Sequence, residues 1–159
     1  MMNYKWKKGI FSSTYELFLN ESKTGELKQE MFSETVYGEI NESNYKFKKK
    51  GIFSSEIEIT DIKSKNQIGK IKFNSWINKA EIFLKEQKIE WKSDSFWGNK
   101  WSIRENNKKM IEYKTSGLSD GNIKSSIEND LLLISGLFTF NYYKKIAAFM
   151  LIMIIIITN

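Results

Sequence analysis

Carboxylate, lysine, tyrosine and hydroxyl groups are the side chains in this sequence that could do acid–base or nucleophilic chemistry. The 159 residues include no His, Cys or Pro. This composition excludes imidazole bases, Ser-His-Asp and Cys-His pairs, His or Cys ligation of zinc or haem, and disulfides. No motif arranges the remaining groups, so we expect a protein that is not an enzyme and holds no cofactor or metal.

The nearest approach to catalytic chemistry is an acidic segment. Glu56, Glu58 and Asp61 are expected on the outer side of one strand. Two carboxylates serve glycoside hydrolysis only when they lie about 5 or 9 Å apart. A hydrolase that uses such a pair is therefore kept as a third hypothesis.

Lysines are the candidates for ligand binding, because the net charge is +6 and a basic protein attracts anions. Residues 7–13 and 49–55 are identical, and each copy precedes an expected strand, so two Lys-Lys-Gly loops would form basic edges. The candidate site for an anionic lipid headgroup comprises Lys7, Lys8, Lys46, Lys48, Lys49 and Lys50.

The same lysines also fit interpretations that involve no ligand. Lysines along a strand keep its outer face solvated and block edge pairing, and the repeated segment fits a loop used twice at a strand entry. Abundant Ile, Asn and Lys also follow from an AT-rich genome. Because Arg104 is the only arginine, and arginine is the usual reader of guanine, we expect no specific nucleic-acid partner.

The length fits a single domain, and most of it alternates apolar and polar residues in short segments. Ile57 and Ile59 alternate with charged neighbours, as do Ile89 and Trp91. Polar clusters such as 20–25, 64–66, 85–86 and 106–108 separate the segments. The pattern predicts a meander of about ten strands that closes into an antiparallel β-barrel.

Aromatic residues gather between 91 and 101. Trp91 and Trp101 are expected on inward faces of strands, whereas Trp97, beside Phe96, is expected to be exposed. The cluster could stack on a base or a sugar ring, but packing of the two inward tryptophans is the favoured interpretation.

The C-terminal segment changes pattern abruptly. Asn129 or Asp130 is a suitable N-cap, and residues 131–140 are apolar around the whole helical circumference, so they must be enclosed by protein or lipid. A helix across a bilayer over 131–158 would place Lys144 and Lys145 near its middle, at about 2.5 to 3.5 kcal/mol each. The sequence therefore favours a helix from about residue 130 inside the barrel.

Residues 144–159 form an apolar tail that extends this helix beyond a domain of residues 1–143. Aromatic, basic and apolar residues follow in an order typical of a membrane interface, and the tail candidates are Tyr142, Tyr143, Lys144, Lys145 and Phe149. Residues 146–158 carry no charge but reach only about 20 Å as a helix, less than the ~30 Å hydrocarbon core. Packing of the tail on the outer rim is the alternative.

Many short strands followed by Asp130 and the apolar run Leu131–Phe138 resemble the tubby C-terminal-like superfamily, which includes LURP-one-related proteins and phospholipid scramblases. Segments 67–71 and 100–103 lie where LURP-one-related chains have comparable strands, and the resemblance covers about residues 5–143. It implies a twelve-stranded barrel threaded by its C-terminal helix and a membrane-associated role. The calcium-binding segment and the Pro-rich and Cys-rich tracts of scramblases have no counterpart here, and the phosphoinositide site of tubby cannot be carried over.

The leading hypothesis is a non-enzymatic lipid- or membrane-associated binding or scaffold protein. The alternative is a soluble protein-interaction domain that uses the tail or the aromatic cluster. Expected partners are anionic membrane lipid or a protein. Since no signal-peptide pattern follows Met1, we expect a cytoplasmic location, peripheral at the inner face of a membrane or inserted there through the tail.

Overall fold

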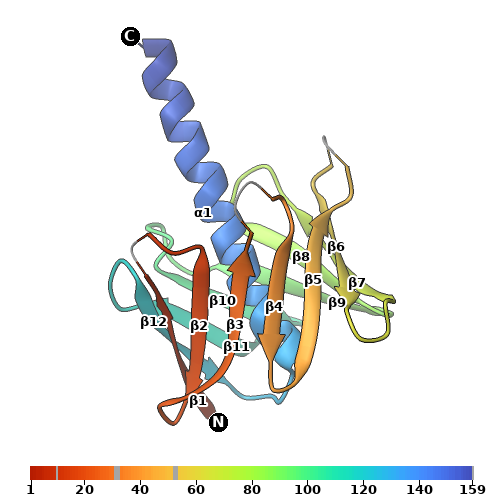
Figure 1. Ribbon diagram of the computed structural model, residues 1–159. Helices are drawn as coiled ribbons and strands as arrows, with labels where there is room; N and C mark the ends of the chain where they lie inside the picture. The colour runs from red at the N-terminus through yellow and green to blue at the C-terminus, as the bar shows by residue number, and fades with distance from the viewer. Residues whose placement is uncertain (10, 31–32, 52–53, 159) are drawn as a thin grey trace.

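A computed structural model describes residues 1–9, 11–30, 33–51 and 54–158. It contains twelve strands and one C-terminal helix (Figure 1). The strands are β1 (Met2–Lys8), β2 (Thr14–Leu19), β3 (Ser22–Gln29), β4 (Val36–Ile40), β5 (Ser43–Lys49), β6 (Glu56–Asp61), β7 (Gln67–Phe73), β8 (Lys79–Leu84), β9 (Gln87–Ser93), β10 (Lys100–Glu105), β11 (Lys108–Thr115) and β12 (Asp120–Ser125). The helix is α1 (Asp130–Thr158).

The strands form one closed barrel in which each strand pairs antiparallel with its neighbours in the chain. Pairing of β1 with β12, from Met2↔Ser125 to Lys7↔Asp120, closes the sheet. The predicted closed antiparallel barrel with a C-terminal helix is confirmed. The barrel has twelve strands, as the family resemblance implied, rather than the ten or so that alternation alone indicated.

Inward residues of the strands and the first half of α1 form a single core. The β-strand period of two places Ile57, Ile59, Trp91 and Ile103 inside, where each is at most 3% exposed. Small inward residues make room for the helix. Gly38 lies so close to α1 that a Cβ there would be 2.9 Å from Cγ1 of Ile134.

The N-terminus of α1 is fixed by polar groups at the end of the barrel where the helix begins. Asn129 caps the helix, since its Oδ1 accepts the backbone N–H of Leu132 at 3.0 Å. Asn41, in the β4–β5 turn, donates from Nδ2 to the Asp130 carboxylate at 3.1 Å. The predicted start of the helix is therefore confirmed.

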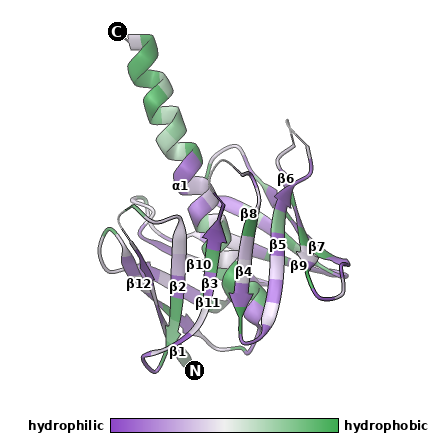
Figure 2. Ribbon diagram, in the orientation of Figure 1, coloured by the Kyte–Doolittle hydropathy of each residue, from purple (hydrophilic) through white to green (hydrophobic). Residues whose placement is uncertain are grey.

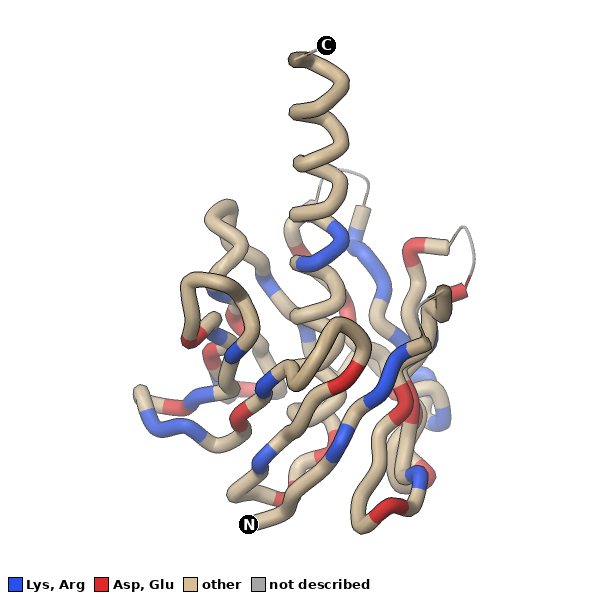
Figure 3. The backbone as a smooth tube through the Cα atoms, turned by 90° about the vertical axis from the view of Figure 1, so that its left-hand side faces the viewer, with Lys and Arg blue, Asp and Glu red and all other residues tan. Residues whose placement is uncertain are grey.

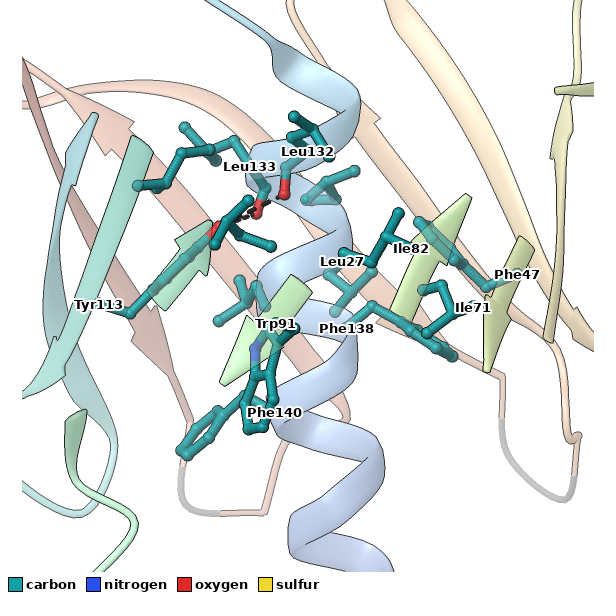
Figure 4. Close-up of a cluster of buried hydrophobic side chains, with 14 of the residues drawn as sticks. Leu27, Phe47, Ile71, Ile82, Trp91, Tyr113, Leu132, Leu133, Phe138 and Phe140 are labelled. Carbon is teal, nitrogen blue, oxygen red and sulfur yellow. Dashed lines mark hydrogen bonds between the residues drawn. The ribbon is translucent and has the colours of Figure 1, made fainter. Parts of the chain in front are cut away.

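The inner half of α1 fills the barrel, and every residue from Leu132 to Asn141 is buried. Side chains of the wall donate hydrogen bonds to its backbone. The Tyr113 hydroxyl donates to the Leu133 carbonyl at 2.9 Å (Figure 4), and Trp91 Nε1 donates to the Gly136 carbonyl at 3.1 Å. Gly136 is required by this approach, because a Cβ there would lie 2.2 Å from the Tyr113 hydroxyl oxygen.

The two ends of the barrel differ. At the end where α1 begins, short polar turns join the strands, and paired left-handed residues typical of two-residue hairpins form three of them: Asn20-Glu21, Asn41-Glu42 and Asn106-Asn107. The predicted loop over 20–25 is shorter than expected, since residues 22–25 belong to β3. Longer connections surround the other end, where α1 leaves the barrel (Figure 1).

Candidate functional site

The helix leaves the barrel at Tyr143, whose ring is packed and hydrogen-bonded to the wall. The backbone N–H of Asn74 donates to the Tyr143 hydroxyl at 3.2 Å, and that hydroxyl donates to the Lys79 carbonyl. Tyr142 is half-buried with its ring centroid 4.1 Å from that of Phe73. The two tyrosines therefore fix the helix where it passes the mouth.

Lysines from three elements surround the helix directly at this exit. Lys144 and Lys145 are exposed on α1, and Lys8, at the end of β1, lines a pocket of about 280 Å³ with both of them. Lys49, at the end of β5, lines a second pocket of about 150 Å³ with Lys145. Figure 3 shows the positive charge on α1 at the base of the projecting helix. We call Lys8, Lys49, Lys144 and Lys145 the mouth lysines.

Lys8 lies close enough to Lys144 for their positive charges to repel each other. Burial lowers the pKa of its ammonium group, and the nearby charge of Lys144 lowers it further. The Lys8 Nζ also lies 5.0 Å from the ring centroid of Tyr15. One carboxylate, Glu34, lines the smaller pocket. A bound anion would relieve the crowding of positive charge.

The six lysines proposed from the sequence do not form one patch. Strand alternation turns Lys46 and Lys48 to the outer wall of β5 while Lys49 faces the mouth. Lys50 forms an ion pair with Glu56 at 3.3 Å, and Lys7 Nζ lies 5.5 Å from the Phe18 ring on the outer wall. Of the proposed residues, the structure brings Lys8 and Lys49 to the helix exit.

Beyond the mouth, the outer half of α1 projects away from the barrel as an apolar rod (Figure 2). Its large side chains from Phe149 to Ile157 are between 40% and 76% exposed, with Phe149 at 64%. Within the described residues, α1 is the one helix long and apolar enough to cross a membrane by length and composition.

The aromatic cluster divides as predicted. Trp91 and Trp101 are 3% and 1% exposed, and Trp101 stacks on Phe140 of the helix with centroids 3.8 Å apart. Trp97 and Phe96 are 86% and 94% exposed in the β9–β10 connection. Trp76, in the β7–β8 connection, is 84% exposed and was not predicted as a candidate from the sequence. It lies between two segments that alternate apolar and polar residues, and this position indicates an exposed connection.

The carboxylates of β6 are engaged in structural contacts. Glu56 pairs with Lys50 and with Lys70 at 3.5 Å; burial raises its pKa, but these lysines outweigh burial and leave the pKa below its usual value. Asp61 accepts the backbone N–H of Ser64 at 2.9 Å, which closes a turn. Within the part of the chain described, no cluster of three or more Asp or Glu side chains could hold a metal ion.

No family model, no curated protein and no solved structure matches this chain. The candidate site is therefore defined by geometry: an apolar helical rod that emerges between the mouth lysines of a closed barrel.

Proposed function

We propose that the protein is a non-enzymatic, membrane-associated binding or scaffold protein whose barrel is held at a lipid bilayer by the outer half of α1. The observation that carries the proposal is the change of exposure along one apolar helix. Leu132–Asn141 are enclosed by the barrel, whereas the large side chains from Phe149 to Ile157 are exposed. A contiguous apolar surface of this kind marks a site of contact with protein or membrane.

Geometry supports lipid as that contact. The stretch Ile146–Thr158 extends about 20 Å at 1.5 Å per residue, which exceeds half of the ~30 Å hydrocarbon core. Because the barrel encloses the inner half, membrane insertion of the outer half leaves Lys144 and Lys145 at the interface instead of mid-bilayer. Lysines at that level interact with headgroups and need not be buried.

The mouth lysines favour anionic lipid as the partner. Each basic residue near an anionic surface contributes about 1 kcal/mol of attraction, and Lys8, Lys144 and Lys145 line one pocket. A place at the inner face of a membrane, where anionic lipids concentrate, follows from this preference.

A role within the tubby C-terminal-like superfamily, among LURP-one-related or scramblase-like proteins, is part of this proposal. The closed barrel of twelve strands with an apolar C-terminal helix inside it supports that membership. A soluble protein-interaction domain is the alternative, since the same exposed rod or the exposed Phe96 and Trp97 could pack on a protein partner.

Flotation with vesicles tests the proposal. The full chain and a variant that lacks residues 146–159 are mixed with phosphatidylcholine vesicles, with or without phosphatidylserine, and centrifuged through a density gradient. We expect the full chain to float, more completely with phosphatidylserine, and the shortened variant to remain at the bottom. A full chain that stays at the bottom with both vesicles would contradict membrane association and leave the protein-interaction alternative.

A further inference from the structure

Large apolar side chains are exposed at one end of the barrel wall. Among the described residues outside α1, seven large hydrophobic side chains are exposed. Five of them lie in connections at the end where α1 leaves: Phe11, Trp76, Phe96, Trp97 and Leu118. We call these five residues the apolar rim; their exposed fractions range from 84% to 101%.

The opposite end provides an internal comparison. Its turns are built from Asn, Glu, Lys and Ser, and the exposed hydrophobic residues there are Met1 at the N-terminus and Ile62 at 41%. Both ends are made of connections between strands of one sheet. The excess of exposed aromatic residues at the helix exit therefore does not follow from the fold and needs another cause.

Hydrogen bonds within each loop of the rim hold its backbone, while the large apolar side chains stay exposed. In the β9–β10 connection, Ser95 Oγ accepts the N–H groups of Asn99 and Lys100 at 3.0 and 3.1 Å, while Gly98 adopts a φ of +66°. In the β7–β8 connection, Asn74 Nδ2 donates to Asn78 Oδ1 at 2.9 Å.

The same arrangement occurs in the other two loops. The backbone N–H of Ser116 donates to the Asp120 carbonyl at 2.9 Å beneath Leu118. In the β1–β2 connection, the N–H of Ser12 donates to the Gly9 carbonyl at 3.0 Å. Hydrogen bonds thus close each loop, and its large apolar side chains remain exposed.

Resting on the proposed function, we propose that the apolar rim docks on the bilayer that receives the tail, so that the barrel stands on the membrane with this end down. The four loops follow one another around the barrel from β1–β2 through β11–β12 and β9–β10 to β7–β8. They therefore form an arc around the axis of α1. An arc of apolar loops around a rod that projects from the same end fits a flat surface, whereas a partner helix or groove would contact one side.

The residue types of the apolar rim are those that favour a lipid bilayer. Tryptophan rings favour the headgroup level of a bilayer, and Phe and Leu insert at the acyl boundary. Trp97 and Lys144 line one pocket of about 230 Å³, which places the rim beside a mouth lysine. Tail, lysines and rim thereby present apolar, cationic and aromatic groups to the same interface.

The absence of cysteine from the sequence allows a direct test. Single variants Trp97→Cys, Leu118→Cys and Lys63→Cys are made in the full chain and labelled with an environment-sensitive fluorophore. Lys63 is the matched control, since it is exposed in the β6–β7 connection at the opposite end. With phosphatidylserine-containing vesicles, labels at 97 and 118 should shift to the blue and be quenched by bilayer-embedded quenchers. The label at 63 should not change.

The outcomes separate the two proposals. A chain that floats while its rim labels stay in water would overturn the rim proposal and leave the proposed function intact, whereas a chain that does not float would overturn both. If a labelled variant does not fold, amide exchange of the unmodified chain over residues 94–99 and 116–119 gives the same test, since docking should slow it.

A second readout uses affinity. Replacing Trp76, Phe96, Trp97 and Leu118 together by Ser should weaken partitioning into vesicles roughly tenfold or more, while Ile62→Ser at the other end should leave it unchanged. Equal partitioning of the fourfold variant and Ile62→Ser would overturn the rim proposal.

Discussion

Leu137 and Ile152 lie on one continuous helix, yet Leu137 is fully buried and Ile152 is 54% exposed. Neither half of α1 is amphipathic, so composition alone says that both halves need an apolar environment. The surrounding chain decides which environment each receives. The barrel is long enough to enclose α1 up to Tyr143, and the pair Lys144-Lys145 marks the boundary. An apolar sequence therefore specifies a need for enclosure but not what encloses it.

The largest difference between the two halves of α1 is expected when each is deleted and the stability of the fold is measured. Removing residues 130–159 empties the barrel and should abolish cooperative folding, because the lost burial exceeds the about 5–15 kcal/mol by which domains are stable. Removing residues 146–159 should leave the melting temperature within a few degrees. Circular dichroism melting and gel filtration would measure both. A soluble, cooperatively melting chain of residues 1–129 would refute the role of α1 as the core.

Shortening one side chain in each half of α1 should also affect the unfolding free energy unequally. Leu137→Ala should cost about 2–5 kcal/mol of unfolding free energy because it leaves a cavity in the barrel. Ile152→Ala, on the outer half, should change it by less than about 0.5 kcal/mol. Urea denaturation without lipid would measure the pair. Equal effects at the two positions would show that the outer half packs on protein.

Gly136 tests how closely the inner half approaches the wall. Gly136→Ala should destabilise the fold by about 1–3 kcal/mol, because its Cβ would collide with the Tyr113 hydroxyl. Tyr113→Phe in the same chain should recover part of this loss, which a double-mutant cycle would detect. No coupling between the two substitutions would mean that the ring moves aside freely.

Asp94, in the β9–β10 connection, should make a pH-dependent contribution to stability that involves neither half of the helix. Burial raises the pKa of Asp94, but hydrogen bonds from Lys109, Ser102 and Arg104 outweigh burial and lower it below its usual value. Its contribution to stability should therefore be complete above pH ~4 and be lost as pH falls through the lowered pKa. Asp94→Asn should be less stable than the unmodified chain at pH 7 by about 1 kcal/mol, with the difference shrinking at acidic pH. A pH-independent difference between the two would contradict this assignment.

The smallest effect on the fold is expected at the boundary between the halves. Replacing Lys144 and Lys145 together by Leu should change unfolding free energy by less than about 0.5 kcal/mol, since both are exposed at the mouth. The same change should increase partitioning into uncharged vesicles because it lengthens the apolar segment. A large loss of fold stability would show that the two lysines hold the barrel mouth together.

Much of the fold follows from local pattern. Alternation placed Ile57, Ile59, Trp91 and Trp101 correctly inside, and capping chemistry located the start of α1 at Asn129 or Asp130. The strand number was underestimated because some strands carry little apolar signal. In β12, the inward residues are Gly121, Ile123 and Ser125, so only Ile123 contributes to the apolar pattern. Gly121 leaves room for the Trp6 ring, because a Cβ there would lie 2.5 Å from Trp6 Nε1.

The site was harder to predict because it depends on closure of the barrel. Lys8, Lys49 and Lys145 are far apart in the sequence and meet only when twelve strands surround the helix. Lys46 and Lys48 are close to Lys49 in the sequence, yet strand alternation and the curvature of the wall direct them elsewhere. The apolar rim likewise requires knowledge of which connections share an end.

Cysteine accessibility along α1 tests most directly whether one helix is divided between barrel and bilayer. Ser135→Cys is nearly isosteric at a buried position, and Ile152→Cys lies on the outer half. In the full chain, residue 135 should resist a water-soluble maleimide with and without vesicles, while residue 152 should react in solution and become protected when vesicles are added. Protection of residue 135 by vesicles alone, or unchanged reactivity of residue 152 with vesicles, would contradict the division.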